Sequence, residues 1–203
     1  MNPFVAAAPQ RRLVLASSSP RRATVLRMLG FDFEIAVAPI DEAAYGLPEP
    51  ETHVVRLAEL KASAAAPAWP DRVLIGADTV VAIDDAILEK PRSAAEALAM
   101  LQRLRGRWHT VFTGVALLDS RTHRRAAAAE RTEVRFAHWD DAGLQRYVES
   151  GECMDKAGAY AIQGLGALLV QEIRGCFYNV MGFPAGTFAR LLAELHDPEA
   201  KHG

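Results

Sequence analysis

One acidic residue, Asp78, lies at a position where its side chain could take part in chemistry. Asp78 interrupts an almost unbroken apolar run from Val73 to Ile83. Such a run is typical of a strand that is buried on both faces. A carboxylate there is unfavourable unless it is paired, hydrogen-bonded or bound to a metal. Asp78 is therefore either a structural anchor for a neighbouring loop or a functional carboxylate.

Two arginines, Arg21 and Arg22, are the second set of candidate functional residues. Residues 13–16 read as a buried strand, and three serines follow it. Ser19 is the expected N-cap of a helix that has Pro20 in its first turn. Arg21 and Arg22 follow at once, although the helix dipole favours anions at this end. A bound phosphate explains the pair, and so does a solvated arginine pair after a tight turn.

Two lysines complete the set of candidate charges. Thr52 is expected to cap a helix that runs to about Ala66, with Lys61 at the edge of its apolar face. A long surface side chain that packs its stem accounts for Lys61 as well as a functional role does. Residues 84–91 predict a hairpin that carries Lys90 back toward the region of Asp78.

The remaining elements position these residues. Ser93 and Glu96 form a capping box for a helix that Gly106 ends. Further along, the pattern predicts long strands at 108–118 and 132–139, a helix from Asp140 through Val148, a glycine-rich loop at 154–164, a hairpin of strands 165–173 and 176–180, and a last helix that ends near residue 195.

Composition limits the class of protein. The chain has 203 residues, half of them apolar, and a formal net charge of −2. These values fit one soluble domain and argue against a general nucleic-acid binder or an anionic-membrane binder. Cys153 and Cys176 have no metal-ligand spacing, which favours reduced thiols in the cytoplasm. No stretch reads as a secretory signal or as a membrane helix.

These stretches together resemble the Maf family of nucleotide pyrophosphatases, once described as septum-formation proteins. No single motif is specific, but their order along nearly the whole chain is. The motifs are Ser17-x-Ser19-Pro20-Arg21-Arg22, Asp41-Glu42, Lys61, Gly76-Ala77-Asp78-Thr79, Glu89-Lys90-Pro91, Asp155-Lys156-Ala157-Gly158-Ala159-Tyr160-x-Ile162-Gln163-Gly164 and Gly182-x-Pro184.

The resemblance implies a fold and an assembly. It implies an α/β fold with a mixed central sheet and flanking helices, and two lobes around a deep cleft. Residues 1–203 would form a single Maf-like domain, with 1–12 as an N-terminal extension and 196–203 as a polar tail. The family members it resembles often form homodimers.

The resemblance also implies an activity. It implies hydrolysis of a nucleoside triphosphate between the α and β phosphates, with Mg²⁺ or Mn²⁺, giving a monophosphate and pyrophosphate. The motifs around Asp78 and Gln163 look like the branch that acts on dTTP and UTP. The alternatives are a house-cleaning enzyme for modified nucleotides such as 7-methyl-GTP and a nucleotide-sensing regulator of cell division.

Each site residue then has an expected role. Hard oxygen ligands suit Mg²⁺ and Mn²⁺, cationic side chains suit phosphates, and an amide matches the edge of uracil or thymine. The expected roles are general base for Asp78; metal ligands for Glu42 and Asp78; phosphate contacts for Arg21, Arg22, Lys61 and Lys90; and base selection for Thr79 and Gln163 with Arg21.

Overall fold

The computed structural model describes residues 2–5, 12–37 and 39–196. Seven strands form one sheet in the order β2-β1-β3-β5-β6-β7, with β4 paired to β3. The sheet is mixed, because β1 is parallel to β2 and β3 whereas β4 and β7 are antiparallel to β3 and β6. The strands are β1 Leu13–Leu15, β2 Phe33–Ile35, β3 Val73–Ile83, β4 Ala86–Leu88, β5 Trp108–Asp119, β6 Arg125–Phe136 and β7 Val170–Arg174.

Helices flank this sheet, which confirms the predicted α/β class. Among the described helices, none is long and apolar enough to cross a membrane. The α-helices are α2 Pro20–Met28, α3 Pro50–Ala65, α4 Ala94–Leu104, α5 Asp141–Glu149, α6 Phe177–Val180 and α7 Ala185–His196. Short 3₁₀ helices lie at Glu42–Tyr45, Ala66–Ala68, Ala157–Ala159 and Gly164–Leu169.

The chain divides into two compact units, and one of the boundaries between them falls between Asp78 and Thr79. We call them the Asp78 unit, residues 1–78, 113–130 and 182–203, and the Gln163 unit, residues 79–112 and 131–181. Strands β3, β5 and β6 each contribute residues to both units. The two lobes and the deep cleft implied by the resemblance stay a prediction.

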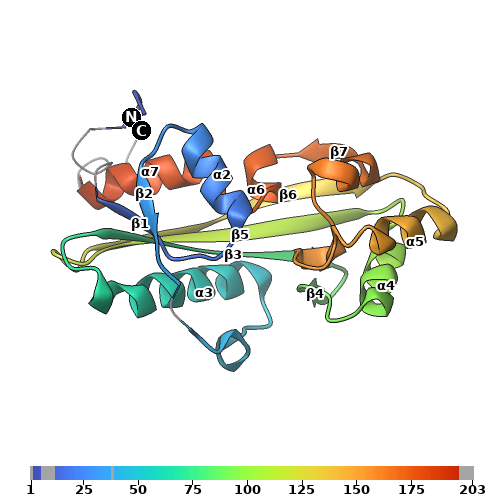
Figure 1. Cartoon of the computed structure of the whole chain (residues 1–203), viewed down its shortest axis with the longest axis horizontal. Coiled ribbons are helices and arrows are strands. Elements are labelled where there is room, and N and C mark those ends of the chain that lie inside the picture. Colours follow the sequence, from blue (N-terminus) through green and yellow to red (C-terminus); the bar gives the residue numbers. More distant parts are fainter. Residues whose placement is uncertain (1, 6–11, 38, 197–203) are drawn as a thin grey trace. The chain divides into compact units, whose positions relative to one another are not determined.

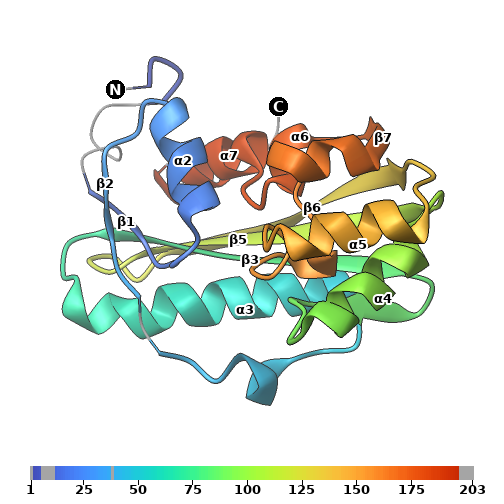
Figure 2. The ribbon, with the colours of Figure 1, turned by 45° about the vertical axis from the view of Figure 1, so that its right-hand side comes forward.

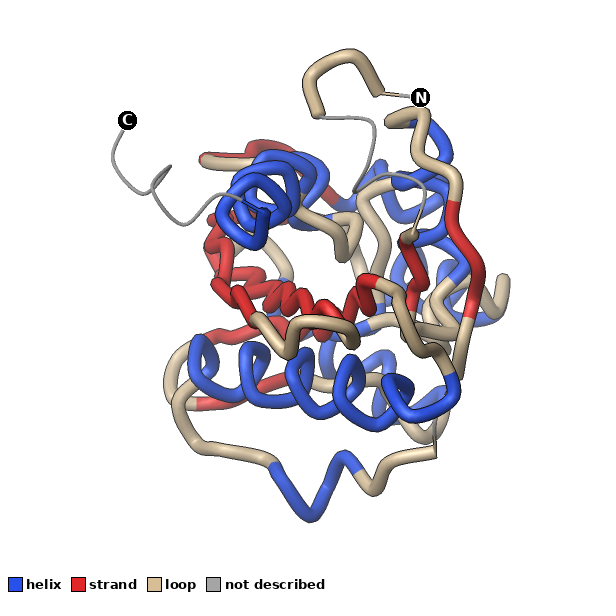
Figure 3. The backbone as a smooth tube through the Cα atoms, turned by 90° about the vertical axis from the view of Figure 1, so that its left-hand side faces the viewer, coloured by secondary structure: helices blue, strands red, loops and turns tan. Residues whose placement is uncertain are grey.

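The Asp78 unit is layered. Helices α2 and α7 cover one face of its strands and α3 covers the other (Figures 1 and 2). Figure 3 shows the strands between these helices, viewed from the side. The apolar face of α3 packs on β1 and β3, where Ala62, Val14 and Leu74 share one buried cluster. The predicted core face of this helix, which includes Val54, is buried.

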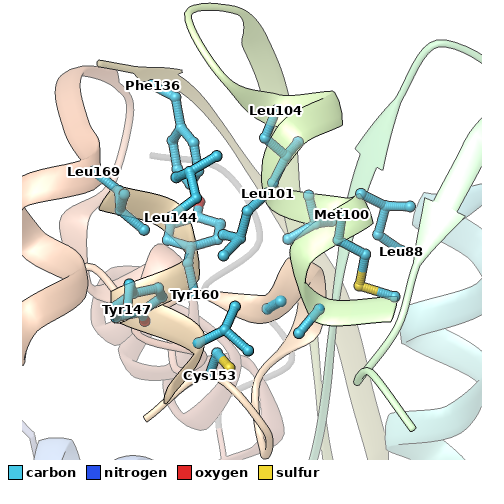
Figure 4. Packing of buried hydrophobic residues seen from close by; sticks show 14 of the residues in the cluster. Leu88, Met100, Leu101, Leu104, Phe136, Leu144, Tyr147, Cys153, Tyr160 and Leu169 are labelled. Carbon is cyan, nitrogen blue, oxygen red and sulfur yellow. The ribbon is translucent and has the colours of Figure 1, made fainter. Parts of the chain in front are cut away.

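The Gln163 unit has a core of its own. Helices α4 and α5 contribute Leu101, Leu104 and Leu144, which meet Phe136 of β6 (Figure 4). Tyr160 of the glycine-rich loop packs its ring 4.6 Å from that of Phe136, edge to face. The loop is therefore anchored in the core of this unit by its own aromatic side chain.

Several predicted boundaries are confirmed and others are wrong. Strand β3 spans the predicted Val73–Ile83, and α4 begins with the predicted capping bond from the Glu96 N–H to Ser93 Oγ, 3.1 Å. Helix α3 begins two residues before Thr52, because the Glu49 carboxylate accepts from the N–H groups of residues 51 and 52. Ser19 is the N-cap residue of α2, but its side chain makes no capping hydrogen bond.

The predicted hairpin at residues 165–180 is also wrong. Residues 164–169 form a 3₁₀ helix, and 177–180 form α6 instead of a strand. Only Val170–Arg174 is a strand, and it pairs with β6. The single-domain assignment, with its extension and tail, stays a prediction, since residues 6–11 and 197–203 lie outside the described residues.

Candidate active site

Lys61 lies between two carboxylates of the Asp78 unit. Its Nζ is 2.7 Å from Asp78 Oδ1 and 3.0 Å from Glu42 Oε2. The side chains of Lys61 and Asp78 are only 13% and 10% exposed, whereas that of Glu42 is half exposed. The ammonium therefore satisfies the buried carboxylate that made Asp78 conspicuous in the sequence.

Backbone packing brings Lys61 and Asp78 together. Lys61 is in the last part of α3 and Asp78 is in the middle of β3. A Cβ at Gly76 would lie 1.9 Å from the carbonyl oxygen of Ala58 and 2.9 Å from the amide nitrogen of Ala62. Glycine at this position lets α3 approach β3 closely enough for the Lys61 side chain to reach the carboxylate.

Arg22 is buried at the start of α2. Its Nε donates to the carbonyl oxygen of Gly182 at 3.0 Å, and its Nη1 donates to Ser17 Oγ at 2.8 Å. Burial lowers the pKa of Arg22, and the nearby charge of Asp78 acts in the opposite direction. These contacts hold α2 to the chain segment before α7. They also place a cation within electrostatic reach of the Asp78 carboxylate.

Arg21 and Glu42 belong to the same electrostatic group. Arg21 lowers the pKa of its neighbour Arg22 further, whereas Glu42 raises it. Five predicted site residues of this unit are thus brought together: Arg21, Arg22, Glu42, Lys61 and Asp78. Cations and carboxylates in one cluster are suited to holding an anion together with a metal.

The Gln163 unit carries the other three predicted residues. Thr79 directly follows Asp78 on β3, and Lys90 follows β4, whose last pair in the ladder is Val81 with Leu88. Lys90 and Gln163 are exposed. Within the part of the chain that the structure describes, neither of these two side chains has a hydrogen-bond or ion-pair partner.

The glycine-rich loop lies against the β3–β4 hairpin of this unit. The Gly158 N–H donates to the carbonyl oxygen of Glu89 at 3.1 Å. Gly158 has φ 66°, and a Cβ there would lie 2.9 Å from a methyl carbon of Val81. The contact fixes the loop next to the residue that precedes Lys90, so the hairpin and the loop form one local surface.

Two residues that sequence reasoning did not assign support this loop. His109 of β5 is buried, and its Nε2 is 2.8 Å from the hydroxyl of Tyr160. Glu152 accepts the N–H groups of Leu165 and Gly166, 3.0 and 2.9 Å away. Tyr160 in the motif offered a hint of a buried partner. Glu152 gave no signal, because backbone donors leave no mark in a sequence.

The fold and the site define a class of protein: an α/β protein that gathers cations and carboxylates around one buried aspartate. The family model described as Maf-like protein matches residues 12–195. The chain belongs to the Maf family, as the sequence motifs indicated.

Its relatives cover nearly its full length. A dTTP/UTP pyrophosphatase from Symbiobacterium thermophilum is 46% identical over 93% of this chain and 96% of its own. A dTTP/UTP pyrophosphatase from Syntrophus aciditrophicus is 43% identical over 91% of this chain and 90% of its own. One from Bacillus cytotoxicus is 42% identical, over 95% and 99%.

Proposed function

We propose that this chain is a nucleoside triphosphate pyrophosphatase that hydrolyses dTTP and UTP to the monophosphate and pyrophosphate. The observation that carries the proposal is its likeness, along nearly the whole chain, to relatives of that name. The clustered charges around Asp78 support it, because phosphoanhydride cleavage depends on neutralised charge and a positioned nucleophile.

In the proposed reaction, a water oxygen forms a bond to the α phosphorus and the bond to the bridging oxygen breaks. Pyrophosphate leaves with the electron pair of that bond. Asp78 accepts the proton of the water as general base, while the Lys61 ammonium, 2.7 Å away, fixes the orientation of its carboxylate. Arg21, Arg22 and Lys90 supply positive charge to the phosphates.

The carboxylates fit a divalent cation. Glu42 Oε2 and Asp78 Oδ1 both bind the Lys61 ammonium, at 3.0 and 2.7 Å, so a cation would bind their other oxygens, which accept no hydrogen bond within the described residues. No group of three or more His, Cys, Asp or Glu among the described residues could hold a metal. Mg²⁺ and Mn²⁺ commonly bind through one or two carboxylates plus phosphates and water, so substrate oxygens would complete the ligand set. When bound, such a cation neutralises charge on the phosphates.

Base selection is assigned to Thr79 and Gln163, with Arg21. The Gln163 amide offers a donor and an acceptor, which match the carbonyl and N–H edge shared by uracil and thymine. Its exposure and its lack of a side-chain partner among the described residues support this role. Cytosine reverses part of this edge, so an amide held in one orientation would be left unpaired with it.

Assembly and compartment are part of the proposal. The family resemblance supports a homodimer, which sedimentation of the purified chain tests. Cys153 and Cys176 are free, which supports a reducing compartment such as the cytoplasm.

A substrate panel tests the proposed function. The purified chain is assayed for pyrophosphate with dTTP, UTP, dCTP, CTP, ATP, GTP and 7-methyl-GTP, in Mg²⁺, in Mn²⁺ and in a chelator. We expect dTTP and UTP to exceed the others by about tenfold or more, and the chelator to abolish turnover. Equal rates on all bases, or a preference for 7-methyl-GTP, would contradict the proposal. Turnover that persists in the chelator would show that the proposed reaction does not need a metal.

A further inference from the structure

Glu152 caps the 3₁₀ helix that directly follows Gln163. Its Oε2 accepts from the Leu165 N–H at 3.0 Å, and its Oε1 accepts from the Gly166 N–H at 2.9 Å. The hydroxyl of Tyr147 on α5 donates to Oε1 at 3.2 Å. Three donors thus fix one carboxylate, which joins the end of α5 to the loop.

Gln163 occupies the N-cap position of this 3₁₀ helix without using its side chain there. An amide or hydroxyl at this position usually accepts an N–H group of the first turn. The Gln163 side chain makes no such bond, and Glu152 satisfies these N–H groups instead. Because Glu152 accepts these N–H groups, the Gln163 amide stays available to a ligand.

The backbone is shaped for this contact. Gly164 has φ 68°, and a Cβ there would lie 2.5 Å from Glu152 Oε2. A Cβ at Gly166 would lie 2.4 Å from the carbonyl oxygen of Ala161. A larger residue at Gly164 would meet the Glu152 carboxylate and one at Gly166 would meet the backbone of the loop itself, so either would disturb the loop.

Electrostatics agree with the geometry. Burial raises the pKa of Glu152, but the N–H groups of Gly166 and Leu165 and the hydroxyl of Tyr147 outweigh it. The positive charge of Lys156 acts in the same direction, so the pKa lies below its ordinary value. The carboxylate is thus ionised at neutral pH and accepts all three donors.

We propose that Glu152 is a positioning residue for base selection, which holds the Gln163 loop so that the Gln163 amide reads the edge of the pyrimidine. This inference rests on the proposed function, because it assumes that Gln163 contacts the base. Glu152 itself acts through the loop backbone. Its loss should therefore affect discrimination between bases more than the chemical step.

Glu152→Gln is the test variant, because it keeps the size of the side chain and replaces one acceptor oxygen with a donor. We expect the ratio of kcat/KM for dTTP over dCTP to fall about tenfold, through a higher KM for dTTP with kcat nearly unchanged. Glu149→Gln is the matched control, since Glu149 ends α5 and accepts only from Gln145 among the described residues. It should keep the ratio of the unmutated protein.

A double-mutant cycle separates positioning from a general structural effect. If Glu152 acts through Gln163, Gln163→Ala combined with Glu152→Gln should be no less selective than Gln163→Ala alone. Effects that multiply, or a ratio for Glu152→Gln within twofold of the unmutated protein, would overturn the inference. If Glu152→Gln does not fold, Glu152→Asp keeps the charge on a shorter stem. Glu152→Asp should lower the same ratio at least threefold, and an unchanged ratio would contradict the inference.

The two proposals fail in different ways. No preference for dTTP and UTP in the unmutated protein would contradict the proposed function and the inference with it. A normal preference that Glu152→Gln leaves intact would overturn the inference alone.

Discussion

The buried histidine of the Gln163 unit makes the stability of this protein depend on pH. His109 is 3% exposed, and its ring packs edge to face on Phe136 and Tyr160 with centroids 4.9 and 5.3 Å away. Burial lowers its pKa from 6.5 to about 3. The imidazole of His109 is therefore neutral in the folded protein throughout the physiological pH range.

The sign of the effect follows from linkage. Between pH 6.5 and about 3 the unfolded chain binds a proton at His109 that the folded chain does not. The stabilisation is thus complete above pH 6.5 and declines as the pH falls. From pH 7 to pH 5 the free energy of unfolding should fall by about 2 kcal/mol from this group.

Urea unfolding at pH 7 and pH 5 measures this loss. His109→Gln removes the titrating group and keeps a polar group near the Tyr160 hydroxyl. Between pH 7 and pH 5, the free energy of unfolding of this variant should therefore fall by about 2 kcal/mol less than that of the unmutated protein. His138→Gln is the control, because His138 is exposed, and its loss should match that of the unmutated protein. Equal losses for His109→Gln and the unmutated protein would refute the reasoning.

Two further predictions concern the Asp78 unit. Asp78→Asn keeps the shape but removes the base, so turnover of dTTP should fall by about 10²–10⁴-fold in protein that still unfolds cooperatively, at a lower temperature because Lys61 loses its buried carboxylate partner. Near-normal pyrophosphate release would remove Asp78 from the mechanism. Gly76→Ala places a Cβ 1.9 Å from a backbone oxygen of α3 and should lower the free energy of unfolding by about 1–3 kcal/mol. Gly186→Ala, where a Cβ has nothing within 4 Å, should leave the urea midpoint unchanged or raised, and equal effects of the two would contradict the packing argument.

Local patterns predicted much of the fold. The apolar run around Asp78 defined β3 at both ends, and the Ser93 capping box placed the start of α4. The strand predicted at residues 165–169 is wrong, because a short apolar run does not distinguish a strand from a helix. Leu165 and Leu168 are 56% and 67% exposed, so these two apolar side chains do not lie in the core.

The site was predictable in its residue types but less so in its partnerships. Asp78 was conspicuous because a carboxylate in a buried strand needs a partner, but the sequence did not name Lys61, 17 residues away, as that partner. The buried contacts of Arg22 with Ser17 and Gly182 were not predicted either, since the second spans 160 residues. Such contacts depend on how elements pack, which periodicity does not encode.

The predicted site residues include side chains that already have partners and side chains that have none among the described residues. Lys61 and Asp78 fix each other in a partly buried pair, so they lose little conformational freedom when a ligand binds and act as preorganised charge. Lys90 and Gln163 are exposed and have no side-chain partner among the described residues, so a ligand has to order them. Each such side chain costs about 0.5–1.5 kcal/mol to immobilise. Both lie next to segments tied down through their backbones, so that ordering would be confined to the side chains, and the proposed selectivity would depend on those backbone ties.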